Sequence, residues 1–284
     1  MRQDHGFKGH GFKGHGFKGD GFKPMPRGKI HASIARHHLL MHISSQAQSR
    51  STPAAYQALT AWYATPLGQH LWHQEQRLVS KALHRRFGYH LLQLGCADLL
   101  LHDTSPMGHK FSFCPHAGVS QRHPAVARNE AIPLANASVD LVLLHHALDF
   151  SGHPHQLLRE VARVLIAGGH LVIVGFNPLS AWGLRNRLHR GRGGDSPWAA
   201  ARLGPARVSD WLNLLDFQVE TTQYGDYVLP LNSERALRWS GWLEPTANRL
   251  NWPTGAVYVI TARKQVLPLT PVQSHWRLPP LGLP

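Results

Sequence analysis

Two adjacent histidines and an asparagine follow the ends of two apolar runs. His145 and His146 come directly after the run 139–144 (VDLVLL), and Asn177 comes after the run 170–176 (HLVIVGF). A neutral imidazole can accept a proton at physiological pH, and a carboxamide can orient a reacting atom. The three residues are therefore candidates for acid–base catalysis and acceptor positioning. The alternatives are a pair of hydrogen-bonded core or surface histidines and a strand-capping asparagine. With 22 histidines in the chain, adjacent pairs arise by chance.

A third apolar run, 89–94, ends in Gly95-Cys96-Ala97. A short buried strand that runs into a glycine turn begins many nucleotide-binding folds, because glycine allows positive φ and a close approach of the ligand to the backbone. Such folds usually place two further glycines after the first, where this sequence has Ala97 and Leu99. The pattern predicts a loop that faces a nucleotide-like cofactor and binds it more weakly than a loop with all three glycines. A plain strand-ending turn at Gly95 is the alternative.

Other kinds of reactive site are not indicated. His153 and His155 are close in sequence, but no Cys/His pairs show zinc-ligand spacing, so no metal site is predicted. The chain contains no G-x-S-x-G elbow, P-loop or H-E-x-x-H motif. Its two cysteines, Cys96 and Cys114, cannot form a disulfide framework, and we expect a reducing cytoplasm.

The elements that must position these residues alternate between strands and helices. Thr65-Pro66 predicts the capped start of a long helix that ends near Phe87. An amphipathic helix at 154–166, ended by Gly168-Gly169, joins two apolar strands in a right-handed parallel βαβ unit. Strands are predicted at 89–94, 109–114, 139–144, 170–176, 217–224 and 256–263, and a short helix at 209–215. The last two strands are expected at the sheet edge, where one antiparallel strand is an open alternative.

Three consecutive blocks resemble the class I S-adenosylmethionine-dependent methyltransferase family, and most of all its type 11 methyltransferase domain. They are Ile132–Leu144 (IPLANASVDLVLL), Pro154–Leu165 (PHQLLREVARVL) and Ala167–Val174 (AGGHLVIV). The family runs LPF…SFDxV, LREixRvL and kPGGrLvi in the same order and with the same spacing. The resemblance covers roughly residues 88–177. The flanking segments TPLG…FG and GFNPLSAWGLRNRL look like a little-characterised bacterial branch.

The resemblance implies an α/β fold with a Rossmann-like, seven-stranded sheet. The sheet would be mostly parallel with an antiparallel strand near its C-terminal edge, and helices would cover both faces. S-adenosylmethionine would lie across the carboxyl ends of the first strands, and a methyl group would pass to a small-molecule or nucleic-acid acceptor. The implied cofactor contacts are Gln93, Gly95, Cys96, Ala97, Asn129, Glu130, Ile132 and His145. The catalytic candidates are His145, His146 and Asn177, chosen by their place at the ends of the strands.

Several positions depart from the family pattern. Gln93 replaces the family's acid in the first strand, and Phe113–His116 offers no carboxylate for the ribose hydroxyls. Arg128 stands near the place of the acid that reaches adenine, which leaves Asn129 or Glu130 as substitutes. The connection from Gly95 to the strand at 109 is also short. These departures keep open a second function, a catalytically inactive fold that binds RNA, a protein or a metabolite.

The chain divides into three regions by composition. Residues 1–50 form a tail that contains four copies of a five-residue unit (HGFKG, HGFKG, HGFKG, DGFKP), which predicts disorder. The repeat also suggests translated tandem DNA, with a native start at Met25 or Met41. The methyltransferase-like domain spans 51–264, and 265–284 is a proline-rich tail.

The charge and hydropathy of the chain limit its partners. A net charge of +14 permits anionic partners such as RNA, and the Gly/Arg-rich segment 189–207 adds to this interpretation. No apolar run approaches the ~20 residues of a membrane helix, so no membrane partner is expected. The sequence does not indicate an oligomeric state.

Overall fold

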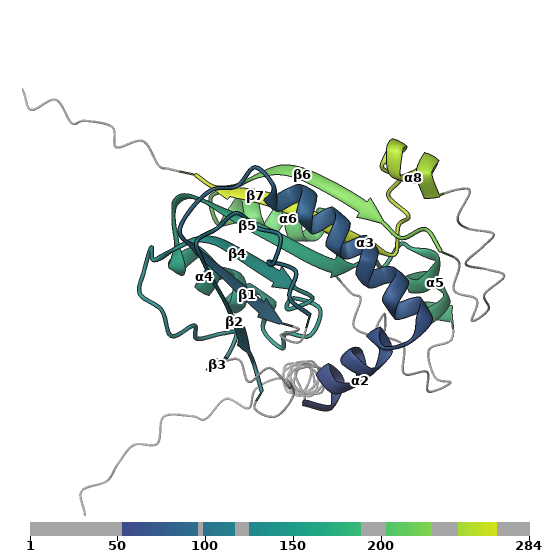
Figure 1. Ribbon diagram of the computed structural model, residues 1–284, viewed down its shortest axis with the longest axis horizontal. Coiled ribbons are helices and arrows are strands. Elements are labelled where there is room, and N and C mark those ends of the chain that lie inside the picture. Colours follow the sequence, from purple (N-terminus) through teal and green to yellow (C-terminus); the bar gives the residue numbers. More distant parts are fainter. Residues whose placement is uncertain (1–52, 96–98, 117–124, 189–202, 229–243, 266–284) are drawn as a thin grey trace, which may run out of the picture. The chain divides into compact units, whose positions relative to one another are not determined.

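The computed structural model describes residues 53–95, 99–116, 125–188, 203–228 and 244–265, which build a single seven-stranded sheet with its helices (Figure 1). The strands are β1 (His90–Gly95), β2 (His109–Cys114), β3 (Ala125–Val126), β4 (Val139–His145), β5 (Leu165–Phe176), β6 (Phe217–Gly225) and β7 (Val257–Lys264). The helices are α2 (Pro53–Tyr63), α3 (Pro66–Leu83), α4 (Pro154–Val164), α5 (Ala181–Leu188), α6 (Pro205–Leu214) and α8 (Glu244–Leu250). The predicted tail 1–50 and all but the first residue of the predicted tail 265–284 lie outside the described residues.

The strand order is β3-β2-β1-β4-β5-β7-β6. Strands β1 to β5 pair in parallel, whereas β7 is antiparallel to both β5 and β6. The predicted mostly parallel sheet with an antiparallel strand near the C-terminal edge is therefore confirmed. The chain direction across the sheet reverses between β1 and β4, and ligands of open α/β sheets bind outside the carboxyl ends of the strands at such a switch point.

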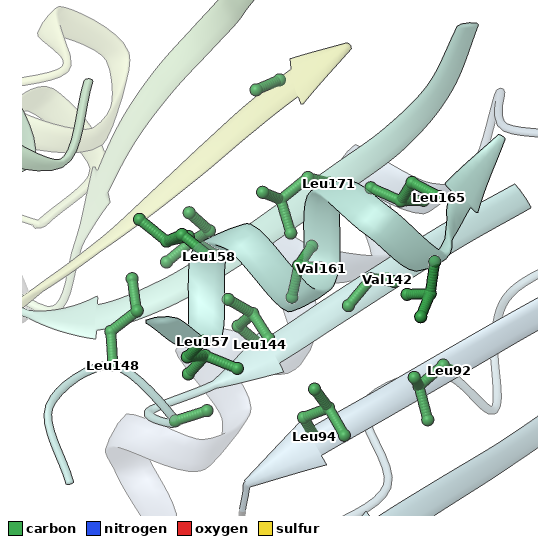
Figure 2. Packing of buried hydrophobic residues seen from close by; sticks show 14 of the residues in the cluster. Leu92, Leu94, Val142, Leu144, Leu148, Leu157, Leu158, Val161, Leu165 and Leu171 are labelled. Carbon is green, nitrogen blue, oxygen red and sulfur yellow. The ribbon is translucent and has the colours of Figure 1, made fainter. Parts of the chain in front are cut away.

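Helices cover both faces of the sheet because its central strands are apolar on both sides. On one face, Leu157, Leu158 and Val161 of α4 pack against Val142 and Leu144 of β4 (Figure 2). The opposite face is covered by α3, whose Leu78, Val79 and Leu83 meet Leu141 and Leu143 of the same strand. Each of these fully buried side chains contributes about 1.5–3 kcal/mol to the hydrophobic stabilisation.

The start of α3 is confirmed, but its predicted end is wrong. Thr65 Oγ1 accepts a hydrogen bond from the Gly68 amide at 3.1 Å, and Pro66 occupies the first turn. The helix ends at Leu83 because the chain beyond it leaves the sheet face, and Phe87 is 78% exposed. The predicted helix is too long because the prediction takes Phe87 as a buried apolar position of the helix.

The two glycines after α4 do not end this helix. The helix ends at Val164, and Leu165 already pairs with Val139 of β4. The register then shifts between Val139 and Leu141, and Gly168 adopts φ +76° within β5. The glycines thus form an irregular first part of β5, which begins five residues earlier than predicted.

Helix α2 lies at the edge of the sheet where β5 ends. Its residues Tyr56, Leu59 and Tyr63 are buried in one apolar cluster with Phe176 of β5 and Phe150 of the loop after β4. This cluster holds α2 at the edge of the sheet formed by the carboxyl ends of the parallel strands. None of the helices in the described ranges combines the length and the apolar character that a bilayer crossing needs.

Candidate active site

Gly95 lies at the switch point of the sheet, directly beside His145. The two residues are partners in the parallel ladder of β1 and β4. Gly95 adopts φ +111°, and an added Cβ atom would lie 2.1 Å from the carbonyl oxygen of His145. The close approach of the two strands therefore requires glycine here. Cys96 and Ala97 lie outside the described residues, so their predicted cofactor contacts stay predictions.

The side chain of Gln93 is fully buried and holds the segment that follows the glycine turn. Its amide donates to the Leu99 carbonyl at 2.7 Å, and its oxygen accepts from the Leu101 amide at 3.1 Å. The same oxygen lies 2.9 Å from Nδ1 of His102. Residues 99–108 form turns and bends, in line with the short connection expected there. Gln93 thus positions the loop beside the candidate site, a role that its place in the sequence did not reveal.

Replacing Gln93 by leucine is expected to lower the free energy of unfolding by about 2 kcal/mol, because the buried Leu101 amide loses its partner. Chemical denaturation of the variant and the wild type measures this difference. Gln218→Leu is the matched control, since Gln218 is exposed on β6 and should change stability by less than about 0.5 kcal/mol. Equal effects of the two substitutions would contradict the assigned role.

His145 and His146 are both fully buried, and both contact a carboxylate that comes from α3. Glu75 Oε2 lies 3.2 Å from Nε2 of His145, and Glu75 Oε1 lies 2.9 Å from Nε2 of His146. The Tyr63 hydroxyl of α2 donates to the same carboxylate at 2.8 Å. Sequence reasoning missed Glu75 and Tyr63. One signal was available: Glu75 lies on the apolar face of α3, four residues after Leu71.

A second carboxylate contacts the other side of His146. Nδ1 of His146 lies 3.0 Å from Oδ2 of Asp149, which also accepts from the Phe176 amide at 3.0 Å. The imidazole ring stacks on Phe176 with centroids 3.8 Å apart. His146 therefore joins the end of β4 to α3 through Glu75 and to the end of β5 through Asp149. We call Glu75, His146 and Asp149 the buried charge network.

Opposite charges keep two members of the buried charge network ionised. Burial alone would lower the pKa of His146, but the carboxylates of Glu75 and Asp149 raise it to about 9. Burial alone would raise the pKa of Glu75, but His146 and His145 lower it to about 2. For Asp149, burial outweighs the contact with His146 and raises the pKa. At neutral pH His146 is thus an imidazolium that donates a hydrogen bond from each ring nitrogen.

Glu75, His145 and His146 also form the one group of three or more potential metal ligands in the described ranges, with their ligand atoms within 4.8 Å of one another. A metal ion needs a lone pair on the nitrogen that binds it. Nδ1 of His146 lies 3.0 Å from Asp149 and Nε2 lies 2.9 Å from Glu75, and the raised pKa favours a proton on both nitrogens. A metal ion at this group would therefore have to displace a proton from His146.

Two buried polar side chains follow the neighbouring strands β2 and β3. Asn129 is 2% exposed, and neither its amide nitrogen nor its oxygen has a hydrogen-bond partner among the described residues. Nε2 of His116 is also buried without a partner within the described part of the chain. Buried polar atoms are almost always hydrogen-bonded. The two side chains therefore offer unused donors and acceptors at the edge where β1 and β4 end.

The other predicted site residues are held by the protein itself. Asn177 donates to the carbonyls of Pro253 and Gly255 at 2.9 and 2.8 Å, which fits the strand-capping alternative. Ile132 is buried, and its backbone amide donates to Glu160 at 3.1 Å. The carbonyl of Glu130 accepts from Gln156 at 3.2 Å. Among the described residues, neither the groove lined by Arg77, Lys81 and Arg249 nor the cavity beside Trp182 and Trp252 includes these residues in its lining.

A family model described as a methyltransferase domain matches residues 89–173. The uncharacterized protein YafS of Escherichia coli K12 is 31% identical over 222 residues, which cover 77% of this chain and 86% of that protein. Malonyl-[acyl-carrier protein] O-methyltransferase of Hahella chejuensis is 37% identical over 76 residues, 27% of each chain.

Two solved structures resemble the fold. One is a chain of the complex between the Haloferax volcanii Trm112 methyltransferase activator and a methyltransferase. It is 16% identical with a TM-score of 0.52, and the match covers 73% of this chain and 96% of that one. The other is a SAM-dependent methyltransferase of Thermotoga maritima, 18% identical with a TM-score of 0.52 over 72% of this chain and 94% of that one. At these identities the likeness concerns the fold alone.

Proposed function

Because the chain belongs to the class I S-adenosylmethionine-dependent methyltransferase family, we propose that it binds S-adenosylmethionine outside the carboxyl ends of β1 to β4 and transfers the methyl group to an acceptor. Such an activity falls in the transferase class EC 2.1.1, and the acceptor would be a small molecule or a nucleic acid. The observation that carries the proposal is the pair of unpartnered buried side chains, Asn129 and His116, at the neighbouring strand ends.

The chemistry of these side chains fits the cofactor. The carboxamide of Asn129 offers one donor and one acceptor, the combination that the edge of an adenine ring needs. Nε2 of His116 can pair with a ribose hydroxyl where the family places a carboxylate. We propose that Asn129 and His116 hold the adenosine part, with Gly95 and Ile132 as neighbours. Cys96, Ala97, Glu130 and His145 complete the proposed contacts, and Gln93 contributes by holding the adjoining loop.

Most of the rate would come from positioning. The bound sulfonium supplies a methyl group on a good leaving group. The protein then has to hold the acceptor in line with it, which lowers the barrier by proximity. The buried charge network fixes the ends of β4 and β5 against α3 for this purpose. The raised pKa of His146 favours the imidazolium, which has no lone pair for a proton, so we propose His145 as the general base.

Calorimetry with S-adenosylmethionine and S-adenosylhomocysteine tests the cofactor proposal. The Asn129→Leu variant should bind either ligand at least about tenfold more weakly, because it loses both hydrogen bonds of the carboxamide, worth together about 2 kcal/mol. Its stability should be equal or higher, because the substitution removes an unpartnered buried amide. Asn213→Leu, an exposed position on α6, is the matched control and should leave the affinity unchanged.

Absence of heat and of a thermal shift with the wild-type protein at millimolar ligand would contradict the proposal. It would favour the catalytically inactive alternative. Most of the Gly/Arg-rich segment, 189–202, lies outside the described residues, so RNA as the partner of such a protein stays a prediction.

A further inference from the structure

A groove with a volume of about 530 Å³ lies along β6, the strand at one end of the sheet order. One wall is β6 from Thr221 to Tyr224, and the other is α3, which packs beside this strand (Figure 1). Asn251, directly after α8, donates to the Thr222 carbonyl at 2.8 Å and accepts from the Tyr224 amide at 2.9 Å. The groove is thus built from three elements that packing and hydrogen bonds hold together. We call it the basic groove.

Three cations line the basic groove, and none of them has an anionic partner among the described residues. Arg77 and Lys81 come from α3, and Arg249 comes from the end of α8. All three residues are exposed. The guanidinium of Arg77 donates to the neutral side chain of Gln74. Within the described ranges, no carboxylate forms an ion pair with Lys81 or Arg249, so their positive charges are not balanced by the protein.

The spacing of the two cations on α3 is unfavourable unless an anion binds there. Arg77 and Lys81 are four residues apart, so their side chains are neighbours on one face of the helix. Like charges at this spacing destabilise a helix, whereas a carboxylate at one of the two positions would stabilise it. The described lining contains neither aspartate nor glutamate. The acid of β6, Glu220, already pairs with Arg86. A ligand that carries negative charge would therefore relieve the repulsion.

Two neutral side chains face the same side as the cations of α3. Residues two apart in a strand point to the same face of a sheet. Gly225 faces α3, because an added Cβ atom there would lie 2.6 Å from Cδ1 of Leu78. Thr221 and Gln223 share this face and line the basic groove. Neither side chain hydrogen-bonds to another residue of the described part of the chain, so both add donors beside the three cations.

This set of donors and its arrangement favour the phosphates of a strand over one small anion. Guanidinium and ammonium groups bind phosphate through charge-assisted hydrogen bonds, to which hydroxyl and amide donors add. The wall from Thr221 to Tyr224 spans about 10 Å, at about 3.3 Å per residue. A nucleic-acid strand carries a phosphate about every 3.4 Å along its axis, so about three phosphates match this length and the three cations. Small-molecule sites enclose most of their ligand, whereas this groove is lined mainly by exposed and half-buried residues.

We propose that the basic groove binds the phosphate backbone of a single nucleic-acid strand and that this strand is the methyl acceptor. The binding follows from the charges and donors of the lining. The link to methyl transfer rests on the proposed function and on location. Gly225, which follows Tyr224, pairs with Val257, and Val257 also pairs with Phe176 at the carboxyl end of β5. The groove therefore reaches the edge of the sheet outside which the cofactor is proposed to bind.

Fluorescence anisotropy with a labelled strand of ten uridines tests the groove in the full chain without methyl transfer. Arg77→Gln, Lys81→Gln and Arg249→Gln should each weaken binding about fourfold at 0.15 M salt, the effect of losing one phosphate contact to a single strand. The slope of log K against log salt concentration should become shallower by about 0.7 for each variant and by about 2 for the triple variant. The melting temperature should not fall, because the three positions are exposed.

Arg159→Gln is the matched control, since Arg159 is exposed on α4, which covers the opposite face of the sheet. It should leave the affinity within about twofold of the wild type, because salt screens a charge at that distance from the strand. Equal effects of Arg159→Gln and the three groove variants would show that the net charge of the chain holds the strand. That result would overturn the proposal.

Two competitors separate a strand from other anions. Uridine monophosphate should displace the labelled strand at least about tenfold less well than an unlabelled strand at equal phosphate concentration, because it offers one phosphate to three cations. Polyglutamate of matched charge should also compete less well, because its carboxylates lack the spacing of the phosphates. Equal competition by the monophosphate would indicate a small nucleotide, and equal competition by polyglutamate would indicate an acidic protein. Either result would overturn the proposal.

Cofactor binding and strand binding are to be measured on the same protein preparation, so that the two proposals fail separately. The strand should still bind when the protein is saturated with S-adenosylhomocysteine. Binding of S-adenosylhomocysteine without any binding of the strand by the wild type at 0.05 M salt would overturn the basic groove alone. Loss of the strand in the groove variants of a protein that binds no S-adenosylmethionine would support the groove and contradict only the proposed methyl transfer.

Discussion

Replacing Glu75 by leucine will lower the free energy of unfolding by about 3–5 kcal/mol, the cost of removing one partner from a buried ion pair. The side chain of Glu75 is completely buried and accepts hydrogen bonds from Tyr63, His145 and His146. Leucine would leave these three donors without their acceptor and His146 without its strongest opposite charge. Urea denaturation at neutral pH, with the midpoint and slope compared to those of the wild type, measures the change.

Two further substitutions separate charge from shape. Glu75→Gln keeps the size and one acceptor oxygen but cannot balance the imidazolium, so it should fall between the wild type and Glu75→Leu. Glu160→Gln on α4 is the matched control, because Glu160 forms its ion pair with Arg163 near solvent, where such pairs contribute about 0–1 kcal/mol. A loss below about 1 kcal/mol for Glu75→Leu would show that the buried charge network does not fasten α3 to the sheet.

The central part of the fold could be predicted from the sequence because local pattern and burial agree there. The runs at 139–144 and 170–176 are continuous and apolar, and their strands are covered by helices on both faces. Pro154 begins α4, and the apolar positions of this helix all meet the sheet. The order strand, helix, strand over residues 139–176 then predicted the parallel crossover. The hydroxyl and proline of Thr65-Pro66 likewise identified the start of α3.

Elements with weak local signals were missed. Strand β3 has two residues, and both are exposed. Helix α5 contains Arg185 and Arg187 but has only Gly183 buried, so it shows no apolar stripe. The groove lined by Arg77, Lys81 and Arg249 likewise joins α3, β6 and α8, which lie far apart in the sequence. Such features depend on packing between elements and leave little trace in any one of them.

The candidate site could be predicted in position but not in its pairings. The histidines at the end of β4 were identified because polar residues after a buried strand stand out. Their partner could not be identified, because Glu75 and His146 are 71 residues apart. His116 was noted only for the carboxylate that it replaces. Its lack of a partner is a property of the folded protein, in which Nε2 is buried and the ring contacts Tyr56 of α2.

The pH dependence of stability provides a second test of the buried charge network, with the opposite sign at each end of the range. The pKa of His146 rises from 6.5 to about 9 on folding. Its contribution to stability is therefore fully present below pH 6.5 and is lost as the pH rises through 9, a loss of about 3 kcal/mol. The pKa of Glu75 falls from 4.5 to about 2, so its contribution is present above pH 4.5 and is lost as the pH falls through 2.

The alkaline limb gives the sharper measurement, because the raised pKa of Asp149 opposes the effect of Glu75 on the acid side. Free energies of unfolding are to be measured between pH 6 and pH 9.5 for the wild type and for His146→Asn. Asparagine tolerates the φ of +52° at this position but does not titrate, so the difference between the two curves isolates the imidazolium. The difference should shrink by about 3 kcal/mol from pH 6.5 to pH 9. A constant difference across this range would mean that His146 is neutral in the folded protein. One ring nitrogen of His146 would then carry the lone pair that a general base or a metal ion requires.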